Sequence, residues 1–294
     1  VKSVWNSERR FVLCSAAALL FFVHPIQTQA VINVVQRSTL LASLFYFLSL
    51  KSYFQGRITD EKKYYCRCAA FAFLGMLSKP LAITLPVMII SSDIFLFGVE
   101  KRVHIKSIIT VAAVTIMAAA VPTGFIGMEK LGLFARDGVQ AFSWGQRLLT
   151  ECVIIFKYFE LLILPVSQNI DYDFPIVQNS PGMPIALFVL GVAGLLAAIA
   201  LTCRRSPLVA VGLMWFLVNF SPVFIFPFAD LIFEHWAYLS SYGFFLCVIV
   251  IGEKLFKNQS ARRAVFAFWL VALTALTLSR VSLWQDPVAL MQAA

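Results

Sequence analysis

The chain has 294 residues, of which 60% are apolar and only 13% are charged, and its net charge is +9. A soluble globular protein has roughly 45–50% apolar and about 25% charged residues, so this composition excludes an ordinary soluble domain. The positive charge does not indicate nucleic-acid binding, because the Lys and Arg residues fall in short loops between apolar runs, the positive-inside pattern of membrane proteins. The sequence therefore predicts an all-α integral membrane protein.

Apolar segments long enough for membrane helices, about 17–25 residues each, recur along the whole chain. A further segment, 149–165, is apolar but carries charged residues, among them Glu151, Lys157 and Glu160. We therefore predict a polytopic bundle of about nine or ten transmembrane helices, forming a single transmembrane domain over residues 1–294. The apolar segments cover residues 8–26, 38–55, 64–79, 81–98, 107–127, 182–203, 207–226, 236–252 and 264–281.

The basic loops predict the orientation of this bundle. Placing them on the cytoplasmic side makes the connections between them face outward. An even number of crossings is then needed between residues 106 and 204, so we predict that segment 149–165 is re-entrant or lies at the outer interface. The basic residues cluster in the ranges 2–10, 57–67, 101–106, 204–205 and 254–263.

The first outward segment, HPIQTQAVINVVQRS over residues 24–38, combines polar residues at helical spacing with Pro25 near a helix start. It predicts an amphipathic helix, or the outer end of one. Its polar stripe either lines an outward cavity, where Arg37 would hold an anion such as phosphate, or faces lipid headgroups. The polar candidates of this segment are His24, Gln27, Gln29, Asn33, Gln36 and Arg37.

Lys79 stands between two apolar runs, directly before the helix-breaking Pro80. It is either a cation for a phosphate, a partner for an acid, or a snorkelling side chain that anchors a hairpin. Asp93 lies deeper in the following apolar segment, where a charge is costly, and is predicted to pair with another group.

Asp171 and Asp173 flank Tyr172 in a polar outward loop rich in turn residues. Two acids so placed suit a metal or a sugar, but they are equally typical of a solvated turn. The sequence thus leaves a divalent metal open, and it predicts no other cofactor.

The segment around Glu234 is the most unusual outward one. Pro222 and Pro227 interrupt it, and Glu234 and His235 then begin the next apolar run, with Tyr238 following. An acid at a helix N-terminus is favourable in itself. An adjacent acid and imidazole at a membrane cavity also suit acid–base chemistry or the orientation of a substrate.

Arg280 closes the last apolar segment, where it either contacts a phosphate or anchors the helix end. All these candidates fall on one predicted side of the membrane. That shared side indicates one outward cavity lined by polar, cationic and aromatic groups, which suits a lipid-linked anionic substrate.

Three blocks carry a family resemblance: HPIQTQAVINVVQRSTLLASLFYFLSL, LSKPLAITLPVMIISSDIFLFG and IFEHWAYLSSYGFF. They resemble, in the same order, blocks of bacterial multi-spanning membrane proteins that carry tetratricopeptide repeats. Those proteins are similar to the animal transmembrane and tetratricopeptide O-mannosyltransferases of the GT-C superfamily. YFELLILPVSQNIDYDFP also resembles a block of this family.

The resemblance implies a GT-C enzyme that takes a sugar from a polyprenyl-phosphate donor and transfers it on the extracytoplasmic face. The catalytic base of such enzymes is an acid in the first outer loop, which is not found in this sequence, so it is expected before Val1. The chain is accordingly expected to be a fragment, inactive alone, that lacks N-terminal helices and C-terminal repeats.

The sequence departs from the animal pattern at three positions, with Gln29 and Pro80 in place of Glu and His235 in place of Arg. These departures change the charge pattern of the predicted cavity and leave the substrate open.

We therefore expect a glycosyltransferase module in a bacterial inner membrane, with its site facing the periplasm. Its expected partners are membrane lipid, a polyprenyl-phosphate-linked sugar and a protein or glycan acceptor, without nucleic acid. The alternative is a non-catalytic scaffold that anchors extracytoplasmic repeats for assembly or polymer export. The predicted substrate-binding residues are His24, Gln27, Gln29, Arg37, Lys79, Asp171, Tyr172, Glu234, His235, Tyr238 and Arg280.

Overall fold

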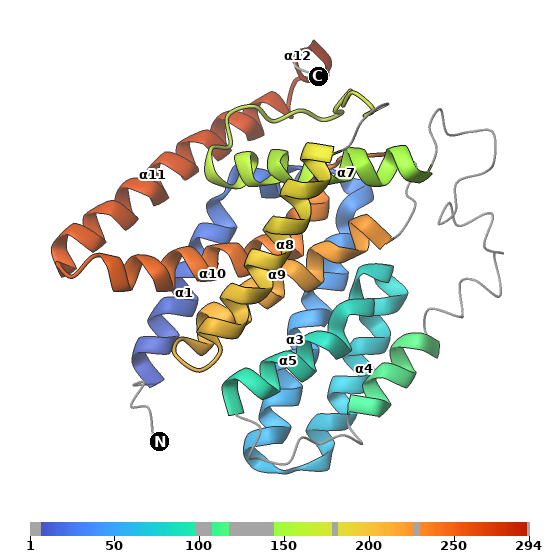
Figure 1. The fold of residues 1–294 in the computed structure, drawn as a ribbon, viewed down its shortest axis with the longest axis vertical. Coiled ribbons are helices and arrows are strands. Elements are labelled where there is room, and N and C mark those ends of the chain that lie inside the picture. The colour runs from blue at the N-terminus through green and yellow to red at the C-terminus, as the bar shows by residue number, and fades with distance from the viewer. Residues whose placement is uncertain (1–6, 98–107, 118–143, 178–181, 226–229, 293–294) are drawn as a thin grey trace.

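The computed structural model describes residues 7–97, 108–117, 144–177, 182–225 and 230–292, and within these ranges the chain forms helices and no β-strand (Figure 1). The predicted all-α class is confirmed. The basic loop at 101–106, Pro227 and most of segment 107–127 lie outside the described residues. The main helices are α1 (Ser7–Val23), α3 (Arg37–Thr59), α4 (Lys62–Ser78), α5 (Leu85–Phe97), α7 (Trp144–Ile163), α8 (Gly182–Thr202), α9 (Pro207–Ile225), α10 (Tyr238–Leu255), α11 (Gln259–Leu283) and α12 (Pro287–Gln292).

The chain is a polytopic helical membrane protein. Among the described residues, five helices are long and apolar enough to cross a membrane, and there are six if α1 and the bent continuation Pro25–Ile32 are counted as one span. This number is smaller than that of the predicted segments, although each described segment is helical. The reason is local: α4 has only 17 residues, and the serines of α3 lower its apolarity. The five helices are Pro80–Phe97, Ile185–Thr202, Pro207–Phe224, Glu234–Leu255 and Gln259–Leu283.

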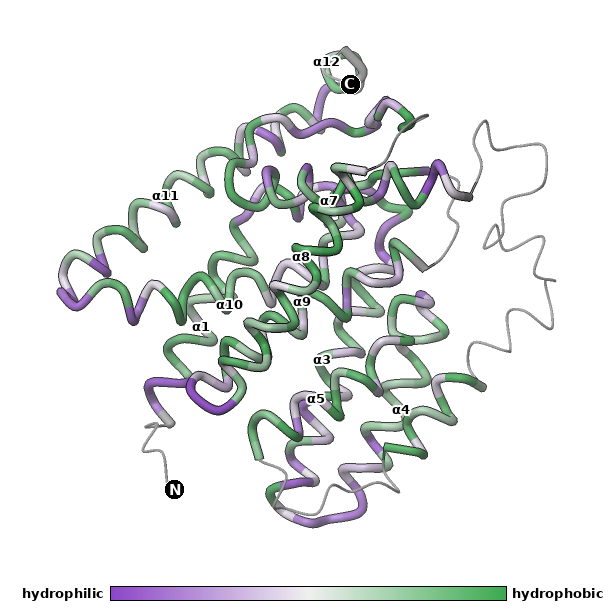
Figure 2. Tube along the Cα trace, viewed as in Figure 1, coloured by the Kyte–Doolittle hydropathy of each residue, from purple (hydrophilic) through white to green (hydrophobic). Residues whose placement is uncertain are grey.

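Helix α7 differs from its neighbours in direction and composition. Figure 1 shows it lying across the bundle, whereas α1 and α3 run along it. It is amphipathic and is not among the described helices apolar enough to span. This agrees with the interpretation of 149–165 as an interfacial or re-entrant segment. Figure 2 shows the hydrophilic residues gathered at helix ends and turns, as between α3 and α4 and between α10 and α11.

Close packing of α9 on α10 holds the centre of the bundle together. A Cβ atom on Gly243 would collide with the backbone oxygen of Gly212, so the two helices approach as near as glycine allows. Next to this contact, the Trp215 indole donates a hydrogen bond of 2.6 Å to the backbone oxygen of Leu239. These contacts fix the start of α10, directly after the turn Glu234–Ala237 that holds Glu234 and His235.

Four helical segments begin with a 3-10 turn: η1 (Pro25–Gln27), η2 (Val34–Gln36), η3 (Pro80–Thr84) and η4 (Glu234–Ala237). Each turn follows a residue with extended backbone: His24, Asn33, Lys79 and Phe233 respectively. Turn η1 contacts η4, and both η3 and η4 contact α9. Two of the predicted outward segments, 24–37 and 221–235, thus meet in space.

The prediction of one amphipathic helix over 24–38 is wrong. The segment is divided into η1, the short helix α2 (Thr28–Ile32) and η2. Extended Asn33, whose side chain accepts a hydrogen bond of 3.1 Å from the Val35 N–H, ends α2. As a result Gln29 is buried while Arg37 is exposed, so the two do not share a polar stripe.

Asp93 has the partner that its sequence position predicted. Its carboxylate accepts hydrogen bonds from the guanidinium of Arg57, at 2.5 Å from Nε and 3.3 Å from Nη2. The two side chains are 0% and 5% exposed. This buried bidentate pair joins α3 to α5.

Candidate functional site

Glu234 is placed by the tyrosine of the transverse helix α7. The Tyr158 hydroxyl donates to the backbone oxygen of Phe233 at 2.8 Å and accepts from the Phe233 N–H at 3.2 Å. The second bond satisfies the N–H of Phe233, which directly precedes η4. The first gives the Phe233 oxygen a second donor beside the Trp236 N–H, which lies 3.1 Å away. The Glu234 side chain is thereby directed into the protein, where it is 0% exposed.

Donors from two other segments surround the Glu234 carboxylate. The Tyr172 hydroxyl donates to Oε1 at 2.7 Å, and the Gln168 amide donates to Oε2 at 2.9 Å. Nη2 of Arg280 lies 3.7 Å from Oε1. We call Gln168, Tyr172, Glu234 and Arg280 the Glu234 cluster. A buried carboxylate is tolerated only with such partners, so the cluster is a built polar site.

Tyr172 is held in its protonated form. Burial, followed by the nearby charge of Glu234, raises the pKa of the Tyr172 hydroxyl well above its usual value. The hydroxyl therefore stays a donor to Glu234 at neutral pH.

Arg280 has unused hydrogen-bonding capacity beside a cavity. Its Nη1 donates to the backbone oxygen of Gln168 at 2.8 Å, and only 8% of the residue is exposed. Its Nε and Nη2 are buried and have no hydrogen-bond partner among the described residues. Arg280, Gln168, Asn169 and Asp286 line a cavity of about 700 Å³. An arginine that lines a cavity and does not use all its donors is suited to bind an anion.

Gln29 joins α2 to η4. Its Oε1 accepts from the backbone N–H of His235 at 2.9 Å and lies 3.0 Å from His235 Nδ1. Because the backbone N–H can only donate, the shared atom is the amide oxygen, and Nδ1 must carry the imidazole proton. The Gln29 amide nitrogen donates to the backbone oxygen of Ile170 at 3.1 Å. Nε2 of neutral His235 is thus left as an acceptor.

Lys79, Gln36 and Thr39 form a second hydrogen-bonded polar cluster. Its ammonium donates to Gln36 Oε1 at 3.1 Å and to Thr39 Oγ1 at 2.6 Å. Burial lowers the pKa of Lys79 from its usual value to about 8, because no carboxylate among the described residues compensates the charge. Both hydrogen-bond partners of Lys79 are neutral side chains, so they do not compensate its positive charge. The ammonium is therefore available to bind an anion.

Four other predicted residues lie outside this arrangement. Arg37 and Asp171 are exposed. Tyr238 packs edge-on against Phe21, with ring centroids 5.1 Å apart. Both nitrogens of buried His24 are engaged, one by the Ile26 N–H and the other by the Leu162 oxygen, each at 3.2 Å. His24 therefore has a structural role.

Gln27 is buried near the site and donates to the Ser241 hydroxyl at 3.0 Å. Its Oε1 has no hydrogen-bond partner among the described residues.

Sequence reasoning missed two residues that organise the site, Gln168 and Tyr158. Gln168 lies three positions before Asp171 in the loop already considered, and Tyr158 lies between Lys157 and Glu160 in the charged apolar segment 149–165. The polar residues before the acid pair were the available signal. As for the metal left open at Asp171 and Asp173, the described part of the chain contains no group of three His, Cys, Asp or Glu residues that could hold an ion.

The fold and the Glu234 cluster define a polytopic helical membrane protein with a buried, charged site beside a cavity. The chain is similar to a protein named protein O-mannosyl-transferase F38B6.6 from Caenorhabditis elegans, with 26% identity over 278 residues. The similar region is 90% of this chain and 38% of that protein, so the chain spans less than half of the relative's length. No family model matches the sequence. No solved structure matches it either.

Proposed function

We propose that this chain is part of a membrane glycosyltransferase of the GT-C type, which transfers a sugar from a polyprenyl-phosphate donor to a hydroxyl of a protein acceptor. The relative's name supports mannose as the sugar and protein as the acceptor. In this proposal the Glu234 cluster faces the extracytoplasmic side, and the membrane is a bacterial inner membrane. The observation that carries the proposal is Arg280, which lines a cavity and has two buried guanidinium nitrogens without a hydrogen-bond partner among the described residues.

The reaction defines what the site must do. The acceptor oxygen forms a bond to the anomeric carbon of the sugar while the bond from that carbon to the phosphate oxygen breaks. Negative charge develops on the departing polyprenyl phosphate, and cationic donors that are already in position stabilise it. The acceptor proton passes to a base, which we do not assign to any residue of this chain.

Arg280 supplies the donor for that charge, and Glu234 positions it. The Glu234 carboxylate is fully buried and accepts from Tyr172 and Gln168, so it acts on the substrate through Arg280. Lys79 supplies a second cation on the α3 side. His235 offers its Nε2 as an acceptor for a sugar hydroxyl, since Gln29 holds the proton on Nδ1.

The test is transfer of labelled mannose from polyprenyl-phosphate mannose to acceptor protein by the complete protein in membranes or nanodiscs. We expect transfer by the wild type and a loss of roughly 100-fold or more with Arg280→Ala, since a charged hydrogen bond to the leaving group contributes about 2.7–4 kcal/mol in comparable sites. Arg204→Ala, which removes an exposed arginine of the α8–α9 turn, is the matched control.

Glu234→Gln separates positioning from folding, because it keeps the shape of the side chain and one acceptor oxygen, and its new amide NH2 can donate to the Tyr172 hydroxyl, while the charge facing Arg280 is removed. We expect reduced turnover with an unchanged thermal midpoint. Wild-type transfer by Arg280→Ala would exclude this site. Failure of the wild type to transfer sugar from any polyprenyl-phosphate donor would favour the non-catalytic scaffold.

A further inference from the structure

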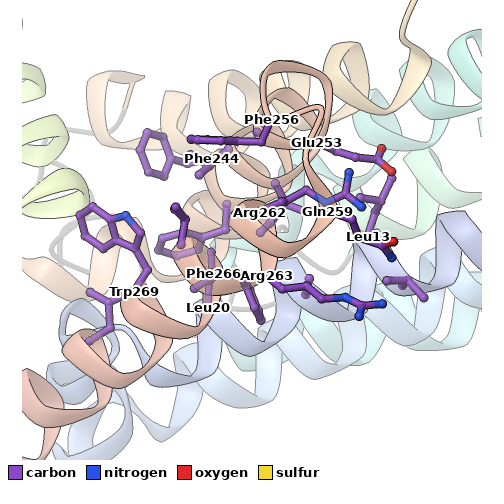
Figure 3. A pocket seen from close by; sticks show the side chains of 18 of the residues that line it. Leu13, Leu20, Phe244, Glu253, Phe256, Gln259, Arg262, Arg263, Phe266 and Trp269 are labelled. Carbon is purple, nitrogen blue, oxygen red and sulfur yellow. The ribbon is translucent and has the colours of Figure 1, made fainter.

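A second cavity lies between α1, α10 and α11, at a distance from the Glu234 cluster (Figure 3). Its volume is about 1040 Å³, at the upper end of the roughly 300–1,000 Å³ that ligand sites occupy. Aliphatic and aromatic side chains form its walls. Among them are Leu13, Leu20, Phe244, Val248, Phe266 and Trp269.

The cavity is a groove that follows the length of α1. Arg9 lines one end, while His24 and Leu162 line the other. Fifteen helical positions separate Arg9 from His24, which corresponds to roughly 22 Å at 1.5 Å per residue. A groove of this length and apolar lining matches an extended lipid acyl chain rather than a compact polar ligand.

The end of the groove at the α10–α11 turn is basic. Arg262, Arg263 and Lys257 line it, and Figure 3 shows both arginines at the same end as Glu253. The acids Glu8 and Glu253 also line this end, and Glu253 is paired with Arg9 at 2.8 Å. Four basic and two acidic residues leave this end with a net charge of +2.

The two arginines are unfavourably placed for the helix that carries them. They lie in the first turns of α11, which holds no acidic residue in its first turn. Cations at a helix N-terminus oppose the helix dipole. Neither arginine forms an ion pair with a carboxylate of the described residues. Asn258 already caps the N-terminus of α11, so a bound anion would act by compensating the charge of the two arginines.

We propose that this groove holds an anionic phospholipid, with an acyl chain along α1 and its phosphate bound by Arg262 and Arg263. Basic pockets between transmembrane helices are typical binding sites for anionic headgroups. The site is distinct from that of the sugar donor, because Arg263 and Arg280 are seventeen positions apart on α11, roughly 25 Å along its axis. The proposal does not depend on the glycosyltransferase assignment.

The test is the thermal stability of the purified, delipidated complete protein with added phosphatidylglycerol or phosphatidylcholine, together with native mass spectrometry of retained lipid. We expect the wild type to prefer phosphatidylglycerol. In the double variant Arg262→Ala/Arg263→Ala this preference should fall roughly 25-fold, about fivefold for each arginine. It should also weaken with increasing salt.

The double variant Arg204→Ala/Arg205→Ala is the matched control, because it removes an exposed arginine pair from another helix turn that does not line the groove. Gly252→Leu tests the apolar part. Gly252 lines the groove, and a Cβ atom there meets nothing within 4 Å, so the larger side chain fills space without a clash. We expect it to lower retention of both lipids and to leave the charge preference intact.

Two results would overturn the proposal. One is equal stabilisation of the wild type by both lipids. The other is an Arg262→Ala/Arg263→Ala variant that keeps the full preference for phosphatidylglycerol. Stabilisation by neither lipid would show that another helix of the protein fills the groove, and would likewise reject the lipid site.

Discussion

Gln29 and His235, which are 206 positions apart in the sequence, share one oxygen atom: Gln29 Oε1 accepts from the His235 backbone N–H at 2.9 Å and lies 3.0 Å from His235 Nδ1. The amide oxygen therefore sets the backbone of η4 and the imidazole tautomer together. Because Glu234 directly precedes His235, this contact also fixes the position from which the buried carboxylate enters its cluster.

Replacing Gln29 should destabilise the protein through its unpaired partners. Gln29→Leu removes the acceptor and leaves the buried His235 N–H unsatisfied, which costs about 1–3 kcal/mol. Thermal unfolding in detergent measures the change, with Gln285→Leu as a control at an exposed position. An unchanged midpoint for Gln29→Leu would show that the contact contributes nothing.

The two buried histidines should carry their protons on opposite nitrogens. His24 Nδ1 accepts from the Ile26 N–H, so its proton is on Nε2, whereas His235 has its proton on Nδ1. Nitrogen-15 NMR of histidine-labelled protein distinguishes the tautomers, and His24→Asn and His235→Asn assign the signals. A proton on Nε2 of His235 would disprove the assigned orientation of Gln29.

Lys79 should make stability depend on alkaline pH. Its pKa in the folded protein is about 8, against 10.5 as the ordinary value. The unfolded chain therefore binds more protons between these values, so stability should rise as pH increases from about 8 to 10.5. Lys79→Met should abolish that part of the rise when thermal midpoints are compared across the range. If the thermal midpoints of the wild type and Lys79→Met depended on pH in the same way, Lys79 would not carry a buried, uncompensated charge.

Removing only one partner of the ion pair between Arg57 and Asp93 should strongly destabilise the protein. Arg57→Met leaves a buried carboxylate without its partner, at about 3–5 kcal/mol. The double variant Arg57→Met/Asp93→Leu removes both charges and should be more stable than Arg57→Met. For comparison, Lys63→Met breaks an exposed pair with Glu61 and should change stability little. A double variant less stable than Arg57→Met would contradict this account.

The sequence predicted the helices well because the length of apolar runs and the basic turns between them are local properties. It also indicated that the segments around Gln29, Tyr172, Glu234 and Arg280 belong together, since all fell on one side of the basic loops. What it did not indicate was the break at Asn33, because one extended residue interrupts a helix without disturbing the polar spacing. Exposed Arg37 and buried Arg280 look equivalent in the sequence.

The contacts within the site depend on packing between distant segments, which a single sequence does not reveal. Gln168 reaches Glu234 only because α7 lies across the bundle and directs the following loop toward η4. The number of membrane-crossing helices was also difficult to predict from the sequence, because α3 combines an apolar segment with many serines.

The central claim is that Arg280 binds the phosphate of a lipid-linked sugar at the Glu234 cluster. The most direct test is the dissociation constant of polyprenyl-phosphate mannose for the purified complete protein in nanodiscs, compared between the wild type, Arg280→Ala and Arg204→Ala. We predict binding by the wild type and by Arg204→Ala, and binding roughly 10–150-fold weaker by Arg280→Ala, as expected for a lost charged hydrogen bond. Equal affinity of Arg280→Ala and the wild type would contradict the claim.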